Sequence, residues 1–130
     1  MIQEYRNTVL KVPAMPVLSD DECEFSTIYV RPKIVSEEKD ENRETKETEI
    51  KSISEIFTKN GVPLKSIYVV GDAGTGKSSF CNYLVNCWCM AHSEGHIVKD
   101  EFGGIDEMKK FEYLFLISLR HNQGKVSFKE

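Results

Sequence analysis

The sequence predicts an α/β fold centred on a parallel β–α–β unit. Residues 66–70 form an apolar, β-branched run of strand length. After residue 76, apolar side chains recur at offsets of three and four, the spacing of one helix face, at Phe80, Tyr83, Leu84, Cys87, Trp88 and Ala91. Residues 111–119 are nearly all apolar, as in a parallel strand covered on both faces. Two such strands joined through a helix make a right-handed β–α–β unit.

Two N-terminal segments are expected to precede this unit. Residues 1–24 are predicted to be irregular, because Pro13 and Pro16 break any helix there. Residues 25–35 are predicted to form an extended segment or edge strand, since Pro32 cannot donate a ladder hydrogen bond.

The middle of the chain changes character twice. Residues 36–48 are predicted to be a charged flexible loop, because almost all of their side chains are charged or small and polar. From residue 49 the apolar spacing predicts a short amphipathic helix, which Asn60-Gly61 would end. Residues 49–130 are interpreted as the front part of a nucleotide-binding domain.

The glycine-rich stretch Gly71-Asp72-Ala73-Gly74-Thr75-Gly76-Lys77-Ser78 fits the phosphate-loop pattern G-x-x-x-x-G-K-[ST] at every defined position. Its glycines lack a Cβ atom, so the backbone is free to adopt positive φ angles and wrap around phosphate oxygens. The amides of the loop and of the next helix's first turn would face the anion. The alternative is a glycine-rich turn without a ligand, which the flanking strand and helix patterns disfavour.

Three side chains of this stretch have expected roles. The Lys77 ammonium suits the β- and γ-phosphates, and the Ser78 hydroxyl suits Mg²⁺. Ser79 is a candidate donor to the α-phosphate. The sequence therefore predicts a nucleoside triphosphate site.

Composition sets the class of protein. The 130 residues are 40% hydrophobic and 29% charged, as in an ordinary globular domain. The net charge of −4 argues against nucleic acid and against an anionic membrane as partners. No secretory signal or membrane-spanning run is apparent. We therefore expect a cytoplasmic protein whose four cysteines are thiols.

A metal site is the weaker interpretation of the cysteines and histidines near residue 90. Cys87, Cys89, His92 and His96 lie close in sequence, but their spacing matches no usual zinc pattern. Cys87 falls on the apolar helix stripe, where a free thiol behaves as a small hydrophobe.

The carboxylate that phosphate-loop enzymes need for Mg²⁺ is not evident. The second predicted strand ends in Ser118-Leu119-Arg120, without an acid. Asp106 and Glu107 follow a segment that is not a buried strand, so we expect both side chains to face solvent. The pattern favours a partial P-loop NTPase fold belonging to a larger domain, with little or no hydrolysis by this chain alone.

Residues 67–80, the helix that continues to Trp88, and the run 111–120 together resemble the opening of NACHT domains in STAND-class signalling NTPases, which include NOD-like receptors. The resemblance covers roughly residues 25–121. It implies an ATP/ADP-switched module with Mg²⁺ that controls self-association in innate-immune or cell-death signalling. It also implies that the extended segment at Tyr29, Val30 and Arg31 contacts the adenine.

Two other functions remain open from the sequence. A small-molecule kinase or other phosphotransferase would use the same loop, although it would need arginines on the transferred phosphate, and Arg120 is the sole arginine after the loop. A truncated, non-catalytic interaction fragment would keep the fold without turnover.

Overall fold

The structure is a computed structural model that describes residues 1–13, 22–94 and 100–117. In chain order, its elements are α1 (Ile2–Thr8), β1 (Lys11–Pro13), β2 (Glu22–Glu24), α2 (Phe25–Ile28), β3 (Val35–Lys39), β4 (Thr45–Glu49), α3 (Ser54–Phe57), β5 (Thr58–Lys59), β6 (Val62–Pro63), α4 (Lys77–Ala91) and α5 (Gly104–Met108). The strands form three separate antiparallel pairs, β1–β2, β3–β4 and β5–β6.

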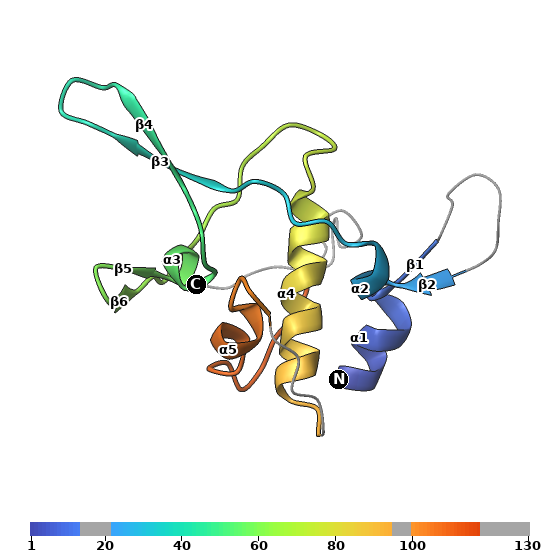
Figure 1. Cartoon of the computed structure of the whole chain (residues 1–130). Coiled ribbons are helices and arrows are strands. Elements are labelled where there is room, and N and C mark those ends of the chain that lie inside the picture. The colour runs from blue at the N-terminus through green and yellow to red at the C-terminus, as the bar shows by residue number, and fades with distance from the viewer. Residues whose placement is uncertain (14–21, 95–99, 118–130) are drawn as a thin grey trace, which may run out of the picture.

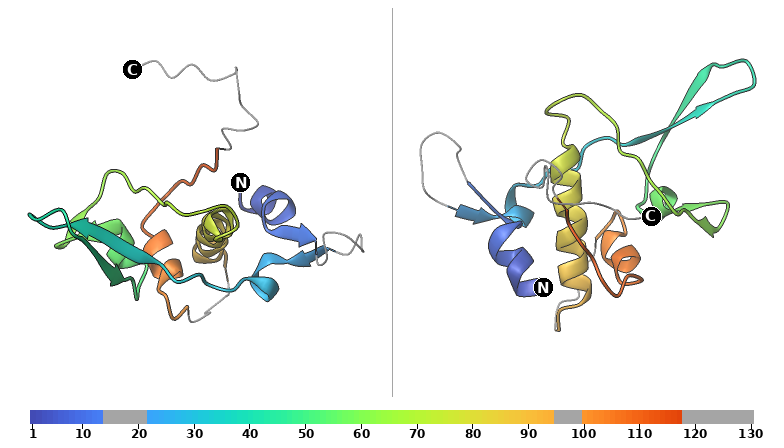
Figure 2. Two further views of the ribbon diagram at one scale, coloured as in Figure 1. Left: turned by 90° about the horizontal axis from the view of Figure 1, so that it is seen from above. Right: turned by 180° about the vertical axis from the view of Figure 1, so that it is seen from behind.

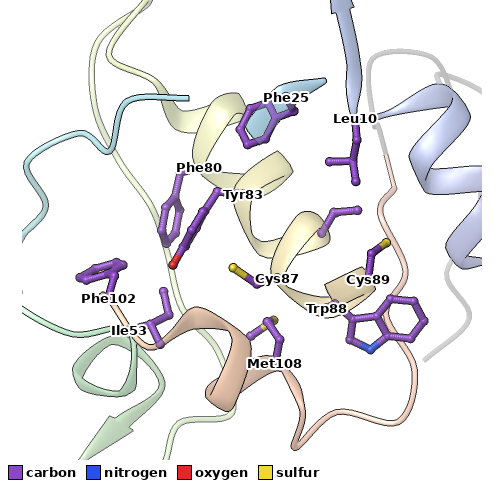
Figure 3. Packing of buried hydrophobic residues seen from close by; sticks show 11 residues of the cluster. Leu10, Phe25, Ile53, Phe80, Tyr83, Cys87, Trp88, Cys89, Phe102 and Met108 are labelled. Atoms are coloured by element: carbon purple, nitrogen blue, oxygen red, sulfur yellow. The ribbon is translucent and has the colours of Figure 1, made fainter. Parts of the chain in front are cut away.

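Helix α4 is the centre of the molecule, with α1 and α2 on one side and α5 on the other (Figure 1, Figure 2). It confirms the helix predicted after the glycine-rich stretch. The buried hydrophobic residues cluster around it (Figure 3); they are Leu10, Phe25, Ile53, Phe80, Tyr83, Val85, Cys87, Trp88, Cys89, Phe102 and Met108.

Helix α4 buries more of its surface than one apolar stripe predicts. Cys89 lies off that stripe in the sequence, yet its side chain is only 1% exposed. Its Sγ atom lies 4.0 Å from the Ile2 carbonyl oxygen of α1. Because α1 covers this second face, Cys89 and Val85 belong to the core.

The expectation that residues 1–24 are irregular is wrong for α1 and for the β1–β2 pair. Helix α1 forms because α4 gives it a surface to cover. The rings of Tyr5 and Trp88 meet edge to face at 6.2 Å, and the Tyr5 hydroxyl donates to the Leu114 carbonyl at 2.7 Å. Residues 14–21, including Pro16, lie outside the described residues.

The predicted extended segment 25–35 begins instead with the helical turn α2. Phe25 is 5% exposed, and its ring lies 4.9 Å from the ring of Tyr29. The turn brings these two aromatic rings onto the same side, where they pack beside α4. The chain then runs without regular structure to Ile34.

The predicted loop at residues 36–48 is a β-hairpin, β3–β4, which projects from the body of the molecule (Figure 1). Its turn is organised by Asp40, whose Oδ1 accepts the amides of Asn42 and Glu44, each at 2.9 Å. Glu38 and Lys46, which carry opposite charges, are cross-strand neighbours in the register of the hairpin. The hairpin is held by the hydrogen bonds of its turn and by backbone hydrogen bonds between the strands. These bonds do not require apolar side chains, so a charged sequence can still form the hairpin.

Asn60-Gly61 is expected to end a helix, but it forms the turn of the β5–β6 hairpin. Asn60 has a φ of 53° and Gly61 a φ of 76°, and they connect β5 to β6. Two consecutive positive φ angles are typical of a type I′ hairpin turn. The predicted helix is confined to α3, residues 54–57.

The two predicted parallel strands are not paired in the described part of the chain. Residues 66–70 have no regular secondary structure, and their exposure alternates, with Ile67 and Val69 37% and 45% exposed and Tyr68 and Val70 87% and 90% exposed. Residues 111–117 are also outside any sheet, with Phe115 73% exposed, and Ser118 and Leu119 lie outside the described residues. Two parallel strands alone bury little apolar surface, and a stable parallel pair needs helices that cover both faces. The apolar pattern of the two runs is therefore not sufficient to make them pair.

Candidate phosphate-binding site

The glycine-rich loop leads directly into the N-terminus of α4. Gly74 has a φ of 80° and Gly76 a φ of 90°, so both adopt the left-handed conformation that glycine makes accessible. Gly71 matters for a different reason, because a Cβ there would lie 2.8 Å from Thr75 Oγ1. The predicted positive φ angles are thus found at Gly74 and Gly76. Gly71 instead leaves room for the Thr75 side chain.

Thr75 and Lys77 close the loop on itself. Thr75 Oγ1 donates to the Asp72 carbonyl at 2.8 Å. Lys77 Nζ donates to the carbonyls of Gly71 at 2.6 Å and Asp72 at 2.5 Å. The single cationic group of the loop is therefore held at its mouth by backbone carbonyls, in a solvent-accessible position from which it can exchange to a stronger acceptor.

Unpaired amides mark the start of α4. Phe80 N donates to the Gly76 carbonyl at 2.8 Å and is the first amide of the helix to be bonded in helical fashion. The amides before it belong to the first turn, where an α-helix has no internal acceptors and carries the positive end of its dipole. Ser78 and Ser79 are exposed in this turn, as are Asp72, Ala73 and Gly74 in the loop. The arrangement presents donors and a cation to solvent.

An open cleft of about 820 Å³ adjoins the loop. Gly71, Thr75, Gly76 and Lys77 are among its lining residues. The lining also includes apolar side chains, at Ile34, Val35, Ile50, Ile56, Leu64, Ile67, Val69 and Phe80, and charged ones, at Lys33, Glu37, Glu38, Glu55 and Lys59. Clefts of this volume that combine apolar walls with a few polar groups suit organic ligands of nucleotide size.

Residues 32–38 form one wall of the cleft. Pro32 lies near Gly76, because a Cβ added to Gly76 would be in ordinary van der Waals contact with Pro32 Cγ at 3.7 Å. Further along, Glu38 pairs with Lys59 of β5 at 2.7 Å, and both residues line the cleft. The wall thus lies beside the loop at one end and contacts β5 at the other.

The three residues expected at the adenine lie elsewhere. The Tyr29 ring stacks on Tyr83 of α4 with centroids 5.1 Å apart. Arg31 Cζ lies 4.4 Å from the centroid of the Phe102 ring, and Val30 is 85% exposed. The cleft wall begins with the next residue, Pro32. Tyr29, Val30 and Arg31 are therefore not among the lining residues of the cleft, and Tyr29 and Arg31 pack on Tyr83 and Phe102 instead.

Asp100 organises a polar cluster beside α4 that the sequence analysis missed. Its Oδ2 accepts the Tyr83 hydroxyl at 2.6 Å and the Gly104 amide at 2.7 Å, and Cys87 Sγ lies 3.6 Å away. Its Oδ1 accepts the Phe102 amide at 3.1 Å. Asp100 accepts the amides two and four residues after it, and Gly103-Gly104 completes the turn. An aspartate shortly before a Gly-Gly pair is typical of an Asx turn, so this pattern could have indicated the role of Asp100.

Burial sets the protonation of this cluster. Burial raises the pKa of Asp100, but its hydrogen bonds from Tyr83, Phe102 and Gly104 outweigh that effect, so the pKa is lowered overall. Burial, then the hydrogen bond to Asp100, raises the pKa of Tyr83, and burial raises the pKa of Cys87 to about 12. Asp100 is therefore the ionised acceptor, and the Cys87 thiol is an unreactive core group at neutral pH.

Two predictions about acids and metals can be compared with the structure. Asp106 is exposed as expected, but Glu107 is buried at 5% exposure and pairs with Lys110 at 2.6 Å, because the turn α5 carries it against the core. No group of three metal-ligating side chains gathers within residues 1–13, 22–94 and 100–117. His96 lies outside those ranges.

Among the helices that the structure describes, none combines the length and apolar character needed to cross a bilayer. Comparisons of the chain with protein-family models, with curated proteins and with solved structures found no match.

Proposed function

We propose that the chain binds ATP or ADP, with the phosphate tail on residues 71–79 and the nucleoside in the adjoining cleft. One observation carries the proposal: a phosphate-loop sequence with two left-handed glycines leads into a 15-residue helix at the end of an open cleft. Backbone amides, a helix N-terminus and a lysine then converge on one anion position.

The residues present fit a triphosphate. The Lys77 ammonium is held by two neutral carbonyl oxygens, and a phosphate oxygen with full charge is a stronger partner. Lys77 therefore exchanges these bonds for bonds to the β- and γ-phosphates when nucleotide binds. The exposed Ser78 hydroxyl would hold Mg²⁺, which neutralises charge between the phosphates.

The biological role we propose is that of a regulatory switch. The resemblance of residues 67–80 and 111–120 to NACHT domains supports an ATP/ADP-dependent module that controls self-association in the cytoplasm, in innate-immune or cell-death signalling. Because the second apolar run ends in Ser118-Leu119-Arg120 without an acid, we expect binding with little or no hydrolysis. Substantial phosphoryl transfer to an acceptor would favour the small-molecule kinase alternative instead.

A non-catalytic interaction role is a second candidate, supported by exposed apolar side chains. Tyr68 is 87% exposed and Val70 90% exposed, and Tyr113 and Ile117 are more than half exposed. Where such side chains form a contiguous patch, they mark contact sites. This role is compatible with nucleotide binding and would show itself as association that does not respond to nucleotide.

Nucleotide-dependent stabilisation tests the proposal. ATP–Mg²⁺ at 100 times its Kd should raise the free energy of unfolding by about 2.7 kcal/mol. Lys77→Ala should abolish this increment, whereas Lys109→Ala, which removes an exposed lysine just after α5, should retain it. The measurement is urea unfolding followed by the fluorescence of Trp88, the single tryptophan. An equal ATP effect on the wild type and on Lys77→Ala, or no effect on the wild type, would contradict the proposal.

A further inference from the structure

Phe102 joins three parts of the molecule beside the cleft. Its ring is 3% exposed and lies 6.3 Å from the ring of Tyr83 in α4. Its carbonyl accepts the amide of Ile53, which precedes α3, at 2.8 Å. Its own amide is held by Asp100. Phe102 is therefore fixed relative to α4, and hence to the phosphate loop that α4 continues.

Arg31 connects the cleft wall to this fixed point. Its guanidinium lies over the Phe102 ring, with Cζ 4.4 Å from the ring centroid, which is cation–π geometry. Two residues earlier, Tyr29 stacks on Tyr83 with an interplanar angle of 14°. One residue later, Pro32 lies beside Gly76 of the loop and begins the wall. Arg31 is thus the last anchor before the wall starts.

We infer that Arg31 is a positioning residue: its contact with Phe102 sets the distance between the 32–38 wall and the phosphate loop, and so controls binding of the nucleoside part of the ligand. The inference rests on the proposed nucleotide site and deepens it. The wall supplies Ile34 and Val35 to the lining of the cleft, which also includes Ile67 and Val69 of the segment that enters the loop. Releasing the wall at residue 31 shifts Pro32 and the Ile34 and Val35 side chains that follow it, whereas the hydrogen bonds that shape the phosphate loop lie within residues 71–80 and do not involve residue 31.

The two ends of the ligand can be separated experimentally. Inorganic tripolyphosphate occupies only the phosphate loop, whereas ATP needs the loop and the wall. Arg31→Ala should weaken ATP binding about two- to fivefold, as expected for one cation–π contact at an exposed arginine, and leave tripolyphosphate binding unchanged. Arg31→Lys, which keeps a cation over the ring, should restore most of the ATP affinity.

The test is isothermal titration of the 130-residue chain with each ligand in the presence of Mg²⁺. Arg43→Ala is the matched control, because it removes an arginine from the distant tip of the β3–β4 hairpin (Figure 1) and should change neither affinity. A double-mutant cycle with Phe102→Leu completes it: once the ring is absent, Arg31→Ala should cause no further loss of ATP affinity. Thermal unfolding of each unliganded variant establishes that it is folded.

Each outcome has a defined meaning. Equal weakening of ATP and tripolyphosphate by Arg31→Ala would mean that Arg31 contacts phosphate directly, which overturns the inference. Unchanged ATP affinity in Arg31→Ala, or additive effects with Phe102→Leu, would overturn it as well. A wild-type chain that binds neither ligand would instead refute the nucleotide site itself, so the two failures are distinguishable.

Discussion

Asp100 should be the most sensitive polar position in the molecule. Its carboxylate accepts hydrogen bonds from Tyr83, Phe102 and Gly104 at 2.6 to 3.1 Å. A hydrogen bond to a charged group contributes about 1.5–3 kcal/mol, and bonds that share one acceptor are not additive. We therefore expect Asp100→Ala to lower the free energy of unfolding by about 2–4 kcal/mol, since it leaves the Tyr83 hydroxyl without its acceptor. Asp100→Asn, which keeps the size but loses the charge, should cost roughly half as much.

The effect of Asp100 should depend on pH. The pKa of Asp100 in the folded chain lies below its unfolded value of about 3.9. Its ionisation therefore favours folding above that value, and the contribution is lost as the pH falls through the lower folded-state pKa. The wild type should lose this increment on acidification, whereas Asp100→Asn has none to lose. The two stabilities should converge at low pH.

Urea unfolding followed by Trp88 fluorescence, at a series of pH values from 7 down to about 3, measures both effects. Glu101→Gln is the matched control, because it neutralises the neighbouring exposed carboxylate. Tyr83→Phe should cost much less in the Asp100→Ala background than in the wild type. The reasoning fails if Asp100→Asn is as stable as the wild type at pH 7, or if both show the same dependence on pH.

Two further substitutions probe the packing around this cluster. Gly104→Ala should destabilise the chain by about 1–3 kcal/mol, because a Cβ there would overlap the Tyr83 hydroxyl and lie 2.7 Å from Cys87 Sγ; unchanged urea unfolding would show that the neighbours move aside freely. Tyr29→Phe should be neutral or stabilising by up to about 1 kcal/mol, since the Tyr29 hydroxyl is buried without a hydrogen-bond partner among the described residues; a loss above about 1 kcal/mol in the same assay would indicate a bound water or ligand at that oxygen.

The parts of the structure that the sequence predicted correctly are local. Helix α4 has an unbroken 3.6-residue pattern, and the loop before it has glycines at the two positions with positive φ. Those features depend on residues within a few positions of one another. The burial of Cys87 followed from the same pattern, whereas that of Cys89 required a second surface, α1, which is distant in sequence.

The parts that were missed depend on turns and on long-range contacts. Asp40 organises the β3–β4 turn through two side-chain hydrogen bonds, although the surrounding charge indicated a loop. The runs 66–70 and 111–117 have strand composition, but a parallel pair needs covering layers that no local pattern specifies. The 111–117 run accepts side-chain hydrogen bonds instead of strand pairing: the Trp88 indole donates to the Phe111 carbonyl, and the Tyr5 hydroxyl donates to the Leu114 carbonyl.

This division between local and long-range contacts also separates the two ends of the candidate site. The phosphate loop is shaped by bonds within residues 71–80, so anion binding should survive changes elsewhere that leave α4 folded. The cleft wall is held by contacts between distant segments, at Arg31 with Phe102 and at Glu38 with Lys59. Arg31, Glu38 and Lys59 are exposed, and contacts made by exposed charged side chains are individually weak. Affinity for the nucleoside should therefore be adjustable by small perturbations that leave affinity for phosphate unchanged.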